Sequence, residues 1–235
     1  MIKIFLVAAI VFDGFLFGGA LNSWGQDAPA IVTQTSARPS QPPAADLVLE
    51  SMCSYGNYRI FAGGSNAKLY TGGIEYDRHS WGYWLGARRD YAAEFLPVMV
   101  LNEPSDTDIW GDRLGPGRKI LYGVGISPVG VRLVWRDGKG LKPWFSTRGG
   151  VLAFDQKVLS RAGTYEQFTL QEAIGLMVKT SPRYDLRLGM FGDFHFSNGF
   201  TTNVNPGLDV MNFSVGLVYH LGSRRATIAS DAPPQ

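Results

Sequence analysis

The chain has 235 residues, a formal net charge of only +2 and a single cysteine, Cys53. The length suits one ordinary domain with tails, and the near-neutral charge gives no reason to expect nucleic-acid binding. One cysteine excludes an intrachain disulfide. Glycine and aromatic residues are plentiful, which favours strands over helices.

The N-terminal region is typical of an exported protein. Residues 1–26 begin with one early charge, Lys3, followed by an apolar run at 4–12, as in a secretory signal peptide. That run is shorter than the ~20 residues of a membrane-spanning helix. Residues 27–46 are rich in Pro, Ala, Ser and Gln, and we expect a disordered linker there.

The body of the chain, residues 47–221, divides into strand-like segments separated by turn residues. We expect eight of them, at 52–63, 67–77, 90–101, 118–134, 142–154, 168–180, 184–197 and 209–221. Their lengths are near the ~9–11 residues with which a tilted strand crosses a bilayer. A chain that crosses a membrane without helices must form a closed barrel, because lipid satisfies no backbone hydrogen bonds.

The sequence therefore predicts an all-β fold, an eight-stranded antiparallel transmembrane β-barrel of the outer-membrane type. The last segment alternates most clearly, with apolar side chains at every second position from Met211 to Leu221 and small or polar ones at most positions between. A soluble β-sandwich or lipocalin-like barrel alternates in the same way and remains the alternative.

The connections differ in length in the way that outer-membrane barrels show. Two are tight (136–140 and 180–183) and three are long (102–117, 155–167 and 198–208). An even strand count places both termini in the periplasm, together with the polar tail 222–235. The end of the seventh segment then emerges at the outer leaflet.

Three side chains at that end are the types that acyl transfer needs. His195 and Ser197 are two residues apart in a strand, so they point to the same side, and Asp209 opens the next segment. Serine would be the nucleophile, histidine its base and the carboxylate the group that orients the imidazole. Asp106, Asp108 and Asp112 lack the spacing of a metal loop, so no metal is expected.

Strict alternation creates a conflict within this grouping. It places Asp209 on the lipid side of the last segment, but His195 and Ser197 on the lumen side of the preceding one. A β-bulge near Gly192 and Asp193 would shift the alternation by one residue, and bulges favour such sites. We therefore predict a bulge there and a site that faces outward to lipid.

The grouping lies within a longer pattern. The element His195-Phe196-Ser197-Asn198 is followed by Asn205-Pro206-Gly207. Weaker elements precede it at residues 122–128, 142–144, 149–150 and 168–169. With these, the region from about Gly72 to Leu221 resembles the lipid A 3-O-deacylase (PagL) family, also described as acyloxyacyl hydrolase-like.

This resemblance implies an outer-membrane barrel that hydrolyses an ester-linked acyl chain of lipid A with a Ser-His-Glu triad and without a metal or cofactor. It makes Ser197 the nucleophile, His195 the base and Asp209, in place of the family's glutamate, the acid. Asn198, Gly199 and Asn205 then become oxyanion or substrate-positioning residues, and Asn205 is the stronger oxyanion candidate.

The partner implied is lipid A within lipopolysaccharide, and the location implied is the outer membrane of a Gram-negative cell. Two other functions stay open. The same triad could act on phospholipid esters, or the barrel could be non-catalytic, with a structural or adhesive role. The oligomeric state is not indicated by the sequence.

Overall fold

The computed structural model describes residues 45–58, 61–62, 66–79, 81–159 and 162–221. The expected signal peptide, most of the expected linker and the expected C-terminal tail lie outside these residues. Within them, no helix is long and apolar enough to cross a lipid bilayer.

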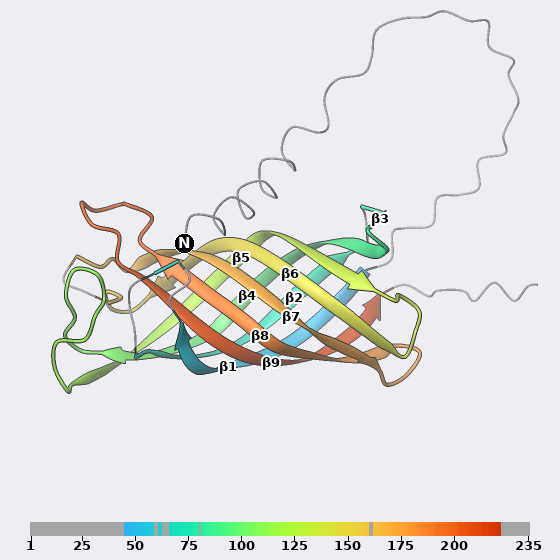
Figure 1. The fold of residues 1–235 in the computed structure, drawn as a ribbon, viewed down its shortest axis with the longest axis horizontal. Helices are drawn as coiled ribbons and strands as arrows, with labels where there is room; N and C mark the ends of the chain where they lie inside the picture. Colours follow the sequence, from blue (N-terminus) through green and yellow to red (C-terminus); the bar gives the residue numbers. More distant parts are fainter. Residues whose placement is uncertain (1–44, 59–60, 63–65, 80, 160–161, 222–235) are drawn as a thin grey trace, which may run out of the picture. The chain divides into compact units, whose positions relative to one another are not determined.

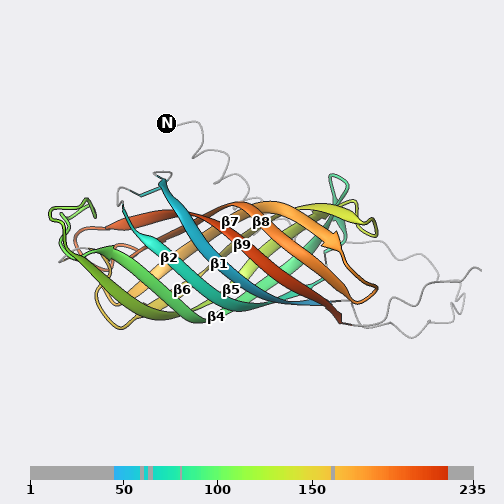
Figure 2. The same cartoon turned by 90° about the horizontal axis from the view of Figure 1, so that it is seen from below.

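The described chain forms one antiparallel sheet that closes on itself (Figures 1 and 2). Its eight long strands are neighbours in chain order, and the pairings β1–β9 and β2–β4 complete the ring. A ninth strand, β3, is a two-residue addition that pairs with the start of β4. The bounds are β1 Ala45–Tyr58, β2 Lys68–Arg78, β3 Tyr83–Trp84, β4 Ala87–Pro104, β5 Arg118–Trp135, β6 Leu141–Phe154, β7 Glu166–Lys179, β8 Tyr184–Ser197 and β9 Gly207–Leu221. The predicted eight-stranded antiparallel barrel is confirmed.

The first strand differs most from its expected position. It was expected at 52–63 and runs instead over Ala45–Tyr58, so Ala45 and Asp46 belong to the sheet and not to the linker. Asp46 was expected in the linker and Glu50 ahead of the first strand, yet both are buried side chains of β1. They face the lumen, where arginines from distant strands neutralise them.

Outward apolar and inward polar side chains alternate along β9, as the sequence pattern of residues 211–221 predicts. Phe213 and Leu217 are 38% and 48% exposed on the outside of β9, whereas Asn212 and Ser214 are buried. Apolar side chains outside and polar ones inside are the arrangement of a barrel in lipid.

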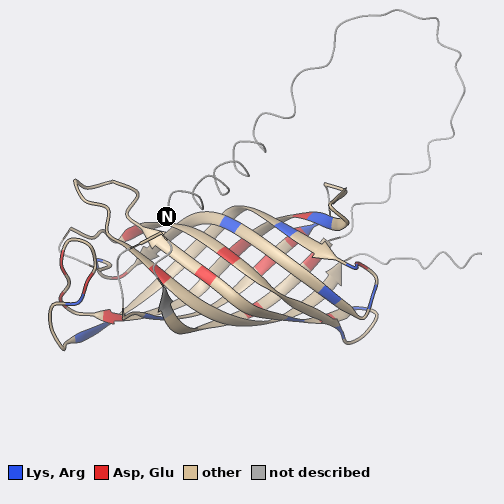
Figure 3. Cartoon of the chain, in the orientation of Figure 1, with Lys and Arg blue, Asp and Glu red and all other residues tan. Residues whose placement is uncertain are grey.

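Buried acidic and basic side chains face the lumen from the end where the described chain begins and ends to the middle of the barrel. Figure 3 marks the positions of the charged residues along the strands. Arg132, fully buried, contacts Asp46 at 2.8 Å and Asp77 at 2.5 Å. His220 and His79 also bond to Asp46, at 2.7 and 2.9 Å. The two histidines that had no place in the catalytic grouping are therefore parts of this lumen network.

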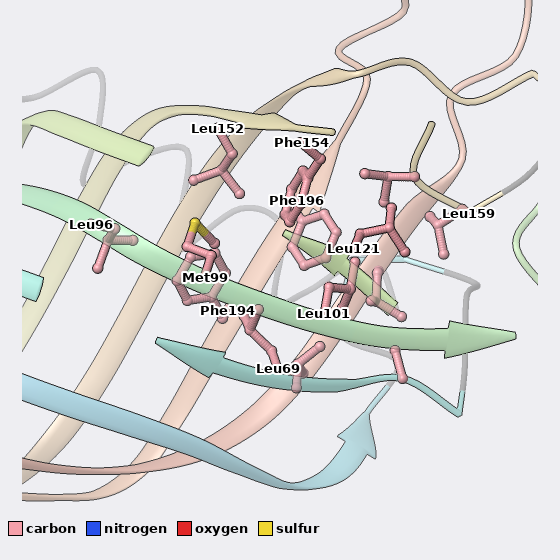
Figure 4. Packing of buried hydrophobic residues seen from close by; sticks show 14 residues of the cluster. Leu69, Leu96, Met99, Leu101, Leu121, Leu152, Phe154, Leu159, Phe194 and Phe196 are labelled. Atoms are coloured by element: carbon pink, nitrogen blue, oxygen red, sulfur yellow. The ribbon is translucent and has the colours of Figure 1, made fainter. Parts of the chain in front are cut away.

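Apolar side chains fill the opposite end of the lumen (Figure 4). Phe194 and Phe196 of β8 point inward and pack there with residues from β2, β4, β5, β6 and β9. Burying a side chain of this size contributes about 1.5–3 kcal/mol. This apolar cluster packs behind the end of β8, which carries His195 and Ser197.

Candidate active site

A bulge in β8 turns the candidate residues outward. Gly189 pairs with Ser214 of β9 and Gly192 pairs with Asn212, so β8 has one more residue than β9 over this interval. Met190 and Phe191 within it are both exposed in succession, at 46% and 56%. The predicted bulge is confirmed. Since β8 changes phase there, the side chains of residues 194 and 196 lie inside and those of 195 and 197 lie outside.

His195 and Asp209 face each other directly across β8 and β9. They are register partners, and the imidazole Nδ1 lies 2.6 Å from a carboxylate oxygen of Asp209. The Asp209 side chain is fully buried and the His195 side chain is 18% exposed. A carboxylate bonded to Nδ1 favours the tautomer that leaves Nε2 free to accept a proton.

The other oxygen of Asp209 is held by main-chain groups of the β1–β2 connection. It accepts hydrogen bonds from the N–H of Phe61 at 2.6 Å and of Ala62 at 2.9 Å. The Phe61 ring also meets the His195 ring edge to face, with 5.5 Å between centroids. Sequence reasoning missed this part of the site and placed these residues inside the first strand.

Ser197 lies beside the dyad at the last position of β8, where it pairs with Gly207. A Cβ at Gly207 would lie 3.4 Å from both His195 Cε1 and the Cβ of Ser197. The serine and the imidazole therefore border the same small space. Within the described residues, Ser197 and His195 share no side-chain hydrogen bond. Nucleophile–base bonds of this kind commonly tighten only when substrate binds.

Asn198 organises the loop that follows the serine. It is fully buried, and its amide nitrogen donates to the Thr202 hydroxyl at 3.0 Å and the Val204 carbonyl at 2.9 Å. Its carbonyl oxygen accepts from the N–H of Phe200. Both ends of this side chain are thus engaged in shaping residues 198–205.

Gly199 and Asn205 present donors that the described residues leave unused. Asn205 accepts a bond from the N–H of Phe200 at 3.3 Å through its side-chain oxygen, which leaves its amide nitrogen available. The N–H of Gly199 likewise has no acceptor in the described part of the chain. Gly199 has a φ of +61°, and a Cβ there would collide with the Phe168 ring. Only glycine fits this position without strain.

Among the described residues, two groups of lumen side chains are close enough to hold a metal ion. These are Asp46, His79 and Asp90, and Glu50, Glu75 and Glu94. Arginines already neutralise both groups. In the 102–117 connection, Asp108 accepts hydrogen bonds from the N–H groups of Trp110 and Asp112, which shapes a turn.

A closed eight-stranded barrel with an apolar outer wall and a lumen of buried charges defines an outer-membrane β-barrel. The family model described as lipid A 3-O-deacylase (PagL) matches residues 65–218. The chain therefore belongs to the PagL family of lipid A 3-O-deacylases, which are ester hydrolases of the outer membrane.

A solved structure supports the same fold. The outer membrane enzyme PagL superposes with a TM-score of 0.52 at 14% identity, over 72% of this chain and 97% of that one. OprG from Pseudomonas aeruginosa gives 0.43 at 7% identity, over 77% and 97%. Neisserial surface protein A gives 0.38 at 12% identity, over 75% and 94%. No curated protein sequence matches the chain.

Proposed function

We propose that this chain is a serine esterase that removes the acyl chain from O-3 of lipid A, with Ser197, His195 and Asp209 as its triad. The observation that supports it most is the 2.6 Å bond between His195 and Asp209 on the outer wall, with Ser197 beside it. Membership in the PagL family supplies the substrate class.

In the first half of the reaction, the Ser197 hydroxyl attacks the acyl carbonyl while His195 Nε2 takes its proton. Asp209 stabilises the charged imidazole and holds its orientation. The tetrahedral intermediate then collapses, the bond to the sugar oxygen breaks, and His195 returns the proton to that oxygen. The product is an acyl-enzyme on Ser197 and a lipid A with a free 3-hydroxyl.

In the second half, a water molecule attacks the acyl-enzyme with His195 again acting as base. The ester bond to Ser197 breaks, the serine regains its proton and a free fatty acid leaves. The N–H of Gly199 and the side-chain amide of Asn205 are the donors we assign to the oxyanion in both halves. Losing one such donor typically costs ~3 kcal/mol of transition-state stabilisation. We assign Asn198 a positioning role, since it fixes the loop that carries both donors.

The position of the site suits this substrate. It lies at the end of the barrel opposite the described chain ends, next to the long connections (Figure 1). With the chain ends in the periplasm, that end faces outward at the outer leaflet, where lipid A is found. A site on the outer side of the wall can receive an acyl chain from the membrane plane.

The test is expression in a lipopolysaccharide-bearing host, followed by mass spectrometry of extracted lipid A. Wild type is expected to release one acyl chain, Ser197→Ala to release none, and Asn205→Ala to react about 100-fold more slowly. The matched control is Ser51→Ala, the same change at an exposed position on β1. Identical spectra for wild type and Ser197→Ala would leave a non-catalytic barrel. Fatty acid release from added phospholipid but not from lipid A would indicate a phospholipid esterase.

A further inference from the structure

We infer that Phe61 and Ala62, in the connection between β1 and β2, belong to the active site. They act as positioning residues for the Asp209–His195 pair. This inference rests on the proposed triad. It concerns residues that precede the family match, which begins at residue 65.

The first observation is how Asp209 is held. One carboxylate oxygen faces His195 Nδ1, and the other accepts two main-chain hydrogen bonds, from Phe61 and Ala62. The side chain is fully buried, so it loses solvation, and these charge-assisted bonds replace it. Two donors on one oxygen fix the plane of the carboxylate and hence the direction in which it meets the imidazole.

The second observation is the contact with the imidazole itself. The Phe61 ring stands edge to face against His195, at an interplanar angle of 68°. The imidazole is therefore bounded by the carboxylate at Nδ1 and by an aromatic ring at its side. A base oriented in this way needs little rearrangement in the transition state.

The third observation places Ala62 at the centre of the site. A Cβ on Gly207 would lie 3.0 Å from the Ala62 methyl and 3.4 Å from His195 Cε1 and from Ser197 Cβ. Four residues from three parts of the chain thus surround one small space. Ala62, in the connection between β1 and β2, is therefore packed against the groups that would carry out the chemistry.

The experiment is a double-mutant cycle in the full-length, purified protein, with fatty acid release from lipopolysaccharide as the readout. Ala62→Pro removes one of the two N–H donors. We expect it to lower kcat about 10- to 100-fold with little change in KM, because the lost bond acts on the base and not on substrate binding. Phe61→Leu is the second test variant: it keeps both donors but removes the ring contact with His195, and the expected loss is at most about tenfold.

The cycle is completed in an Asp209→Ala background. If the donor acts through Asp209, Ala62→Pro costs less than about twofold there, because the effects of coupled residues do not add. Equal losses in both backgrounds, or an unchanged kcat for Ala62→Pro, would overturn the inference. Only barrels with the mobility of the folded form in unheated gel electrophoresis are assayed, so misfolding does not enter the comparison.

A second measurement tests the same inference without the Ala62→Pro variant. Amide hydrogen exchange at Phe61 and Ala62 is expected to be slower in wild type than in Asp209→Ala, and unchanged in Ser197→Ala. Equal exchange in wild type and Asp209→Ala would overturn the inference. Failure of the proposed function gives a different pattern, because wild type and Ser197→Ala would then show equal activity whatever the state of the connection.

Discussion

The absence of one side chain, at Gly207, leaves room for the candidate triad. Gly207 pairs with Ser197 across the last hairpin, and a Cβ in its place would meet Ala62, His195 and Ser197 at 3.0–3.4 Å. Those distances are short enough that a neighbour must move by a few tenths of an ångström. The shortest of these contacts, at 3.0 Å, is with the methyl group of Ala62, whose N–H donates to Asp209.

We therefore expect Gly207→Ala to reduce kcat by about 10- to 100-fold, because a shift of Ala62 disturbs its hydrogen bond to Asp209 and so the orientation of His195. The barrel should lose no more than ~1 kcal/mol of unfolding free energy, because a methyl group at these distances displaces its neighbours only slightly. The control is Gly72→Ala on β2, where an added Cβ has no atom within 4 Å. Kinetics of fatty acid release and urea unfolding in detergent check both parts. Equal activity of Gly207→Ala and Gly72→Ala would contradict the expectation that the triad needs the space left by Gly207.

Among the residues of the site, the sequence allows some to be predicted and others not. His195, Ser197 and Asp209 can be selected because their side chains are chemically distinctive and their spacing fits neighbouring strands. Phe61 and Ala62 cannot, because what they contribute to Asp209 is main-chain N–H, which every residue except proline has. The contact also spans 147 positions of the chain for Ala62, and local pattern carries no signal over that distance.

At the scale of one strand, the bulge in β8 decides which face of the wall carries the site. Without the extra residue, His195 and Ser197 would share the lumen face with Asp185 and Arg187, both of which are fully or almost fully buried inside. The bulge could be predicted since the alternation of two neighbouring strands conflicts with a shared catalytic surface. The start of β1 could not, because nothing in the sequence next to Asp46 and Glu50 shows the arginines of other strands that neutralise them in the lumen.

Deletion of Met190 tests this interpretation. It removes the extra residue, so His195 and Ser197 are expected to turn into the lumen and activity to disappear. A thiol at Ser197→Cys, in a Cys53→Ser background, should react with a membrane-dissolved maleimide in the otherwise intact chain. The same thiol should be protected once Met190 is deleted. Labelling of the thiol at the same rate with and without Met190 would show that the bulge does not decide whether residue 197 faces the lipid or the lumen.

The lumen of the barrel has two layers: an apolar cluster behind the site, and buried ion pairs toward the other end, among which a second apolar cluster packs (Val48, Val134, Trp144, Met177 and Val218). Glu75 illustrates the second layer, since it pairs with both Arg148 and Arg187 and is almost completely buried. Buried ion pairs add little net stability over apolar packing, but removing one partner leaves an uncompensated charge. This layer therefore makes the barrel intolerant of single changes at the end remote from the chemistry.

Arg132 is the residue at which this intolerance should be greatest. Its guanidinium is fully buried and pairs with four carboxylates, those of Asp46, Asp77 and Asp90 at up to 3.2 Å and that of Glu75 at 4.0 Å. Arg132→Ala is expected to lower the free energy of unfolding by about 3–5 kcal/mol, the usual cost of breaking a buried pair from one side. The measurement is urea unfolding of the refolded barrel in detergent micelles.

The control for Arg132 is Arg183→Ala, at an exposed position in the turn between β7 and β8. A surface change of that kind is expected to stay within about 0.5 kcal/mol of wild type. In the fraction of Arg132→Ala that remains folded, kcat should be unchanged, because the ionic network and His195 lie at opposite ends of the barrel. A large fall in kcat without loss of stability would show that the lumen network reaches the site, and that the two layers do not act separately.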